Sequence, residues 1–161
     1  MALMFSSEPQ RTYWEHHLFK CIRSRGLSVV GVGFPADASY FGAYDARTGM
    51  IQYFLELTEE ELAMVLTHEL VHAVIRPPSP DAEPYCEHEQ ESEEHIVGRV
   101  AALICAHFGL GDYYQAMRAR SAGFLDEPSP DESATAAELA ERLLAELDQN
   151  NERGEMTASI A

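Results

Sequence analysis

The sequence predicts an α+β domain of 161 residues, in which a small antiparallel β-sheet packs against helices. Residues 27–57 contain short runs rich in β-branched and aromatic residues, separated by clusters of turn-forming residues. After residue 58 the apolar residues recur at intervals of three and four, which is the spacing of amphipathic helices. Because 46% of the residues are hydrophobic, we expect the chain to bury a globular core.

Three strands are predicted, over Leu27–Phe34, Tyr40–Tyr44 and Met50–Leu57. The last two flank Asp45–Gly49, whose composition favours a turn, so they are expected to form a hairpin. Two roles are open for this hairpin. Its edge could bind a substrate strand through main-chain hydrogen bonds, or it could only support the helices.

Helices are predicted on both sides of these strands. The first is expected over residues 7–25, before Gly26, because glycine commonly follows the last turn of a helix. Thr58 and Glu61 have the spacing of a capping box, which predicts a helix over residues 58–75. Two consecutive prolines end this helix, because proline cannot continue the backbone hydrogen bonding.

Further helices are predicted over residues 88–108, 112–121 and 135–148. The last of them opens with a second capping box at Thr135 and has an apolar face. From Gln149 onward the chain is polar, and we expect this tail to be disordered. The predicted organisation is thus one domain over residues 1–125, then a linker, an amphipathic helix and a disordered tail over residues 126–161.

The charge of the chain bears on its partners and location. Because 27 acidic residues outnumber 11 basic ones, the net charge is −16. A phosphate-binding surface needs clustered Lys and Arg, so we expect no nucleic-acid binding. The N-terminus lacks the basic region and apolar run of a signal peptide, and no segment approaches the roughly 20 apolar residues of a membrane span. We therefore expect a cytoplasmic protein that does not bind membranes.

The strongest functional signal is the sequence His68-Glu69-Leu70-Val71-His72, an H-E-x-x-H motif within the helix predicted over residues 58–75. Residues four apart lie on one face of a helix, so His68 and His72 can direct two imidazoles at one Zn²⁺ ion. Glu69 is then placed to act as general base on a water that the zinc activates. The alternative is an ordinary helix with two hydrogen-bonded histidines and a solvated glutamate. The apolar residues around the motif favour the zinc site over this alternative.

A catalytic zinc site needs a third protein ligand. The start of the helix predicted over residues 88–108 is rich in carboxylates. When the apolar stripe of that helix is followed back by three and four residues, it reaches Glu93, which should therefore face the core. Glu94 lies about 100° around the helix and is the second choice, and Glu91 is the third.

The layout resembles the ImmA/IrrE family of small zinc metallopeptidases, over about residues 27–108. The resemblance rests on a short hairpin with an aromatic-Gly stretch, a capped T-E-E-E helix that carries H-E-L-V-H-A, and a following helix with an E-x-E pattern. It implies a zincin-like fold of the gluzincin type. It also implies that His68, His72 and Glu93 bind zinc and that Glu69 is catalytic.

The resemblance further implies regulatory proteolysis, since members of this family cleave or antagonise repressor proteins. We therefore expect a zinc endopeptidase with a specific protein substrate, of the kind found in phages and mobile elements. The alternative is a zinc-containing binding module that sequesters a regulator without cleaving it. A peptidase also needs a group that stabilises the oxyanion. Five side chains are candidates: His88, His95, Tyr85, Tyr113 and Tyr114.

Overall fold

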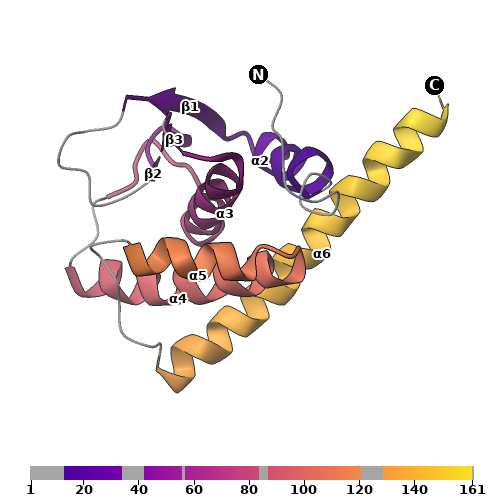
Figure 1. Ribbon diagram of the computed structural model, residues 1–161. Coiled ribbons are helices and arrows are strands. Elements are labelled where there is room, and N and C mark those ends of the chain that lie inside the picture. The colour runs from indigo at the N-terminus through magenta and orange to yellow at the C-terminus, as the bar shows by residue number, and fades with distance from the viewer. Residues whose placement is uncertain (1–12, 34–41, 56, 84–86, 121–128, 161) are drawn as a thin grey trace.

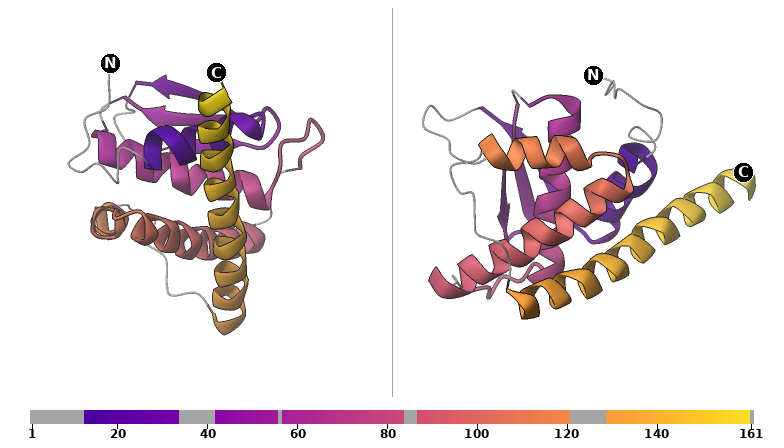
Figure 2. Two further views of the ribbon diagram at one scale, coloured as in Figure 1. Left: turned by 90° about the vertical axis from the view of Figure 1, so that its right-hand side faces the viewer. Right: turned by 60° about the horizontal axis from the view of Figure 1, so that its bottom comes forward.

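The computed structural model describes residues 13–33, 42–55, 57–83, 87–120 and 129–160. Within these residues the protein is a mixed α+β fold that is mostly helical, as the sequence predicts. A small sheet lies on one side of helix α3 (Glu59–Ile75), and helices α4 (Glu87–His107) and α5 (Gly111–Arg120) lie on the other, as Figures 1 and 2 show. Helix α3, which carries the H-E-x-x-H motif, is thus the middle layer of the molecule.

The sheet contains β1 (Ser28–Val32), β2 (Gly42–Asp45) and β3 (Met50–Phe54), in the order β1-β3-β2. Strands β2 and β3 form the predicted antiparallel hairpin, but β1 pairs with β3 in parallel. The prediction of a wholly antiparallel sheet was therefore wrong. The reason is strand order: β3 occupies the centre, so the chain passes from β1 to the far edge and returns antiparallel along β3.

The hairpin turn is closed by local hydrogen bonds. The amide of Gly49 donates to the carbonyl oxygen of Asp45 at 2.9 Å, and Gly49 has a φ of 75°, a conformation that favours glycine. The turn also holds the proline-rich segment that follows α3. There, Ser79 N donates to Ala46 O at 2.8 Å and Arg47 Nε donates to Ala82 O at 3.1 Å. These contacts fix the loop leaving α3 to the sheet.

The motif helix α3 begins where the sequence predicts. The Thr58 hydroxyl accepts a hydrogen bond from the Glu61 amide at 3.2 Å, and the Glu61 carboxylate accepts one from the Thr58 amide at 3.0 Å. This is the predicted capping box. Ten residues of α3 are buried, so the helix is enclosed by the layers on both sides rather than lying on the surface. At its buried N-terminal half, the Tyr13 hydroxyl donates to the hydroxyl of Thr67.

The last helix differs from the prediction at both ends. Helix α6 spans Pro130–Ile160, so it begins before Thr135 and continues through the residues expected to be disordered. Its capping box uses Ser129 and Glu132 instead: the Glu132 amide donates to Ser129 Oγ at 3.1 Å, and the Ser129 amide donates to the Glu132 carboxylate at 2.9 Å. A Pro at the first helical position suits this start, because its missing N–H is not needed there.

Helix α6 crosses α4 and reaches the N-terminal helices, which are a π-helix, η1 (Tyr13–Leu18), and α2 (Phe19–Ser24) (Figure 2). Its apolar face is therefore used in packing. One core cluster joins these elements to α3 and the sheet. Besides Tyr13, the largest fully buried side chains are Leu18, Ile22, Ile51, Met64, Leu66, Leu70, Val71, Ile104, Leu110, Leu143 and Leu147.

Among the described residues, Cys21 and Cys105 are buried free thiols. No helix in the described parts of the chain combines the length and apolar character that crossing a membrane requires.

Candidate metal centre

Helix α3 places His68 and His72 side by side, with ring centroids 5.1 Å apart. They differ in burial, because the His72 side chain is 11% exposed and the His68 side chain is 26% exposed. Both rings lie on the face of α3 that meets the start of α4. The sequence spacing alone predicts this pairing, since the i, i+4 relation is a property of the helix itself.

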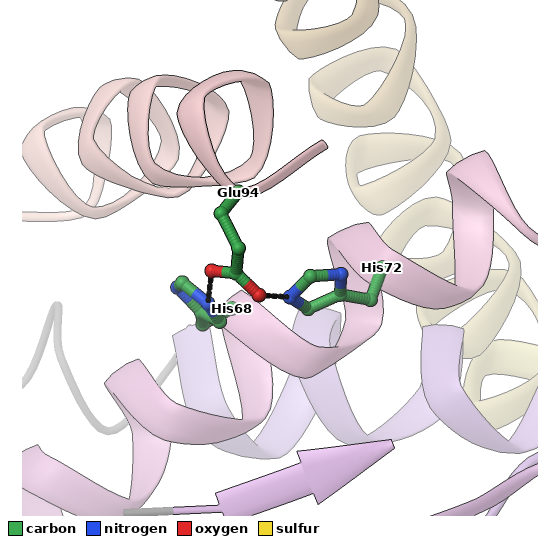
Figure 3. A group of neighbouring side chains, drawn as sticks. All are labelled: His68, His72 and Glu94. Atoms are coloured by element: carbon green, nitrogen blue, oxygen red, sulfur yellow. Dashed lines mark ion pairs between the residues drawn. The ribbon is translucent and has the colours of Figure 1, made fainter. Parts of the chain in front are cut away.

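The residue that joins the two histidines is Glu94, which reaches them from α4 (Figure 3). Its Oε1 lies 2.8 Å from His72 Nε2, and its Oε2 lies 3.4 Å from His68 Nε2. The three side chains offer one ligand atom each within 4.8 Å of one another, which is close enough for a shared metal ion. We call His68, His72 and Glu94 the ligand group.

The structure does not bring Glu93 into the ligand group, although the sequence favours it as the third ligand. The Glu93 side chain does face the core and is only 12% exposed, but its Oε2 lies 2.8 Å from Nδ1 of His72, on the other side of the ring. Glu91, the third choice, is exposed and also lies outside the group. The second choice, Glu94, is thus the carboxylate that the geometry places between both Nε2 atoms.

His68, like His72, has a hydrogen-bond partner at Nδ1. The hydroxyl of Tyr114, on α5, lies 3.1 Å from His68 Nδ1 and donates to the carbonyl oxygen of Gly98 at 3.4 Å. Tyr114 is 2% exposed, so these contacts lie in the interior. Each histidine of the ligand group therefore contacts Glu94 through Nε2 and a different residue through Nδ1.

The ionisation of the ligand group reflects burial and close opposite charges. Burial alone would lower the pKa of His72, but hydrogen bonds with Glu93 and Glu94 outweigh it and raise that pKa to about 10. Burial would likewise raise the pKa of Glu94, but hydrogen bonds with His68 and His72 hold it well below its usual value. These opposite shifts favour a protonated His72 beside an ionised Glu94.

Glu69 lies next to the ligand group without belonging to it. It is 7% exposed, and burial raises its pKa, against the opposing influence of His68 and His72. Its side chain is close to edge strand β2, because a Cβ atom on Gly42 would lie 3.7 Å from Glu69 Cγ and 2.6 Å from Val65 Cγ1. Sequence reasoning did not identify Gly42 as a neighbour of the site, and no local signal could have done so, since the contact joins a strand to a helix.

The donor chemistry of the ligand group fits zinc. Two imidazole nitrogens and one carboxylate oxygen form a ligand set that catalytic zinc sites use, with a fourth position left for water or substrate. The Nε2–carboxylate contacts of 2.8 and 3.4 Å place the three donor atoms close together. Oxygen-preferring ions such as Mg²⁺ and Ca²⁺ match two imidazoles poorly.

The candidates for oxyanion stabilisation are placed as follows. The hydroxyl of Tyr114 is already engaged by His68 and Gly98, behind the ligand group. The ring of His95 contacts Glu132 on α6 at 3.3 Å. Tyr85 and the side chains of His88 and Tyr113 lie outside the described residues. Both described candidates, Tyr114 and His95, therefore have hydrogen-bond partners within the fold.

Comparison of the chain with protein-family models, with curated proteins and with solved structures finds no match.

Proposed function

We propose that this protein is a zinc-dependent endopeptidase with a zincin-like centre. His68, His72 and Glu94 would bind the zinc ion, and Glu69 would act as general base. The observation that carries the proposal is the convergence of the Nε2 atoms of both motif histidines on one carboxylate of α4. The H-E-x-x-H spacing explains two of these residues, and the fold brings the third to them.

Zinc, when bound, would polarise the substrate carbonyl and make a water molecule at the site more acidic. Glu69 would take a proton from the attacking water and pass it to the amine nitrogen that leaves as the peptide bond breaks. Its burial beside the two histidines supports this role, because a carboxylate with few water contacts is a stronger base than an exposed one.

The substrate would be a protein segment in extended conformation. Strand β2 is an edge of the sheet and lies against α3 close to Glu69, so main-chain pairing along β2 would bring a peptide bond near the site. The resemblance to the ImmA/IrrE family points to a transcriptional repressor as the protein cleaved. The alternative function, a zinc-containing module that only sequesters a regulator, receives less support, because the described apolar residues of α6 pack on the core.

The test combines metal content with hydrolysis. Wild type, Glu69→Gln and the control Glu60→Gln on the same helix are loaded with zinc and incubated with a mixture of unfolded proteins. New N-termini are then identified by mass spectrometry. We expect one zinc per chain in all three proteins, and cleavage by the wild type and Glu60→Gln alone. Losing Glu69 as general base should lower the rate by about 10²–10⁴-fold.

Three results would contradict the proposal. A wild type that binds no added zinc would remove the metal centre altogether. Unchanged cleavage by zinc-loaded Glu69→Gln would exclude Glu69 as the base. Zinc binding without cleavage of any protein, together with relief of repression by Glu69→Gln in cells, would establish the sequestering module instead.

A further inference from the structure

The two histidines of the ligand group each have a hydrogen-bond partner at the nitrogen that faces away from Glu94. His72 Nδ1 lies 2.8 Å from Glu93 Oε2, and His68 Nδ1 lies 3.1 Å from the hydroxyl of Tyr114. The partners come from different helices, α4 and α5, and both are buried or nearly so. Each ring is therefore held at Nδ1 by a partner on the side away from Glu94.

The donor and acceptor roles at these contacts are set by chemistry. A carboxylate oxygen accepts hydrogen bonds, so at the 2.8 Å contact with Glu93 Oε2 the hydrogen belongs to His72 Nδ1. The Tyr114 hydroxyl donates its hydrogen to Gly98 O, which leaves its lone pairs to accept from His68 Nδ1–H. In both rings the hydrogen is thus held at Nδ1, and Nε2 is the nitrogen that can offer a lone pair to a metal.

We propose that Glu93 and Tyr114 are positioning residues, which fix the Nδ1–H form and the orientation of His72 and His68 for metal binding. This inference rests on the proposed zinc centre and assigns Glu93 a role different from that of a ligand. Partners of this kind orient a ligating imidazole and increase its basicity, and their loss costs metal affinity even though they do not touch the ion.

The two partners should differ in strength. The Glu93 contact is shorter and involves a carboxylate, and hydrogen bonds with a charged partner are about twice as strong as neutral ones. The Tyr114 contact is longer, and the partner that it offers to His68 is an uncharged hydroxyl. We therefore expect a loss of zinc affinity of about 10–100-fold for Glu93→Ala and a smaller loss, roughly 3–10-fold, for Tyr114→Phe.

The experiment measures the zinc dissociation constant by competition with a chromophoric chelator at fixed pH. Two nearly isosteric variants, Glu93→Gln and Tyr114→Phe, accompany Glu93→Ala and preserve the packing of the core. Glu93→Gln keeps an acceptor but loses the charge, so its affinity should fall between wild type and Glu93→Ala. Matched controls are Glu91→Gln, an exposed carboxylate two residues before Glu93, and Tyr53→Phe on β3, and both should bind zinc as wild type does.

A second readout separates positioning from general stability. In zinc-loaded protein labelled with ¹⁵N-histidine, long-range ¹H–¹⁵N spectra should show protonated Nδ1 and unprotonated Nε2 in both rings. Glu93→Ala should make the Nδ1 proton of His72 exchange quickly with water while the His68 signals keep their pattern. Tyr114→Phe should have the reverse effect. Loss of packing alone would disturb both rings together.

The outcomes distinguish this inference from the proposed function. If folded Glu93→Gln and Tyr114→Phe bind zinc within twofold of wild type, the positioning role is overturned and the metal centre stands. If Nε2 carries the proton in the zinc-loaded wild type, the inference is also overturned. If the wild type binds no zinc, the metal centre and the positioning roles both fail.

Discussion

Two groups of histidine and carboxylate lie next to each other at the start of α4, and they are built differently. In the ligand group, Nε2 of His68 and of His72 converge on Glu94 from α3. In the second group, which we call the helix clip, Glu132 on α6 accepts hydrogen bonds from Ser92 Oγ at 2.8 Å and from His95 Nδ1 at 3.3 Å. Glu94 and His95 are consecutive residues, yet they belong to different groups.

The difference shows how two histidines that are placed to share a metal ion differ from a histidine in a purely structural contact. In the helix clip, the Glu132 carboxylate accepts hydrogen bonds from Ser92, His95 and the backbone amide of Ser129. In the ligand group, one carboxylate faces two rings that are each held separately at Nδ1 by Glu93 and by Tyr114. Two rings that are oriented through Nδ1 and direct their Nε2 atoms at one carboxylate are arranged to share a metal ion. In the helix clip the hydrogen bonds need no metal ion.

The largest expected effect comes from removing the carboxylate of the ligand group. Glu94→Ala deletes a proposed ligand, so zinc affinity should fall by more than about 100-fold, beyond the loss expected for a residue that only orients a ligand. Glu132→Ala removes the corresponding carboxylate of the clip and should leave zinc affinity within twofold of wild type. Both affinities are measured by chelator competition. Equal losses in the two variants would show that the two groups are not independent.

A second effect concerns alkaline pH. In the metal-free protein the pKa of His72 is raised to about 10 from 6.5. The native state therefore holds a proton that the unfolded chain has lost, so this stabilisation is full below about pH 6.5 and disappears as pH rises through 10. Between pH 7 and 8.5 the free energy of unfolding should decrease by about 2 kcal/mol, at roughly 1.4 kcal/mol per unit.

The measurement is denaturant unfolding in the presence of a chelator at several pH values. His72→Gln is the control, since it removes the titrating group and should flatten the dependence. The window ends at pH 8.5 because burial raises the pKa of Cys21 and Cys105 to about 12, so their thiols affect stability only when the unfolded chain begins to ionise them. A wild type with constant stability from pH 7 to 8.5 would contradict the ion-paired state of His72.

The smallest effect belongs to the helix clip and has the opposite pH dependence. Hydrogen bonds from the Ser129 amide and from the Ser92 hydroxyl lower the pKa of Glu132 to about 2. The contribution of Glu132 to the free energy of unfolding is therefore full above its unfolded-state pKa of 4.5, and it is lost as pH falls through its folded-state pKa of about 2. At pH 7, Glu132→Ala should cost about 1 kcal/mol, the usual value of a helix cap. Glu138→Ala, exposed on the same helix, is the matched control in thermal unfolding.

How much of the site could be predicted from the sequence depends on whether a feature is local. His68, Glu69 and His72 lie on one helix, and their relation follows from its geometry whatever the rest of the chain does. The capping box at Thr58 and Glu61 is local in the same way, and the structure contains it. Features that need two distant elements were less accessible, as the parallel pairing of β1 with β3 shows.

The choice of the third candidate ligand illustrates this limit. Following the apolar stripe of α4 identifies the carboxylate that points most directly at the core, and Glu93 does so, with 12% exposure against 35% for Glu94. The Nε2 atoms, however, lie at the border of the core rather than at its centre. The less buried carboxylate, Glu94, therefore contacts both Nε2 atoms, and the more buried one, Glu93, contacts Nδ1 of His72. The orientation of α4 relative to α3, which decides between the two, is not encoded in either helix alone.

The start of α6 was misplaced for a related reason. Thr135 and Glu138 match the pattern of a capping box, but so do Ser129 and Glu132. The second pair prevails because Glu132 also bonds to Ser92 and His95 of α4, a contact that no local pattern contains. Helix α6 thus begins where its first turn can form hydrogen bonds with α4.

The adjacency of Glu93 and Glu94 has a consequence for how this chain can change in length. Each inserted or deleted residue turns a helix by about 100°, so a single insertion between Glu94 and Val97 would separate the two carboxylates from the apolar stripe that seats α4. A change in the number of residues between α3 and α4 would not alter this relation, because it lies before the helix begins. Related sequences should therefore vary in loop length before α4 and keep an unbroken count of residues from Glu93 through Val100.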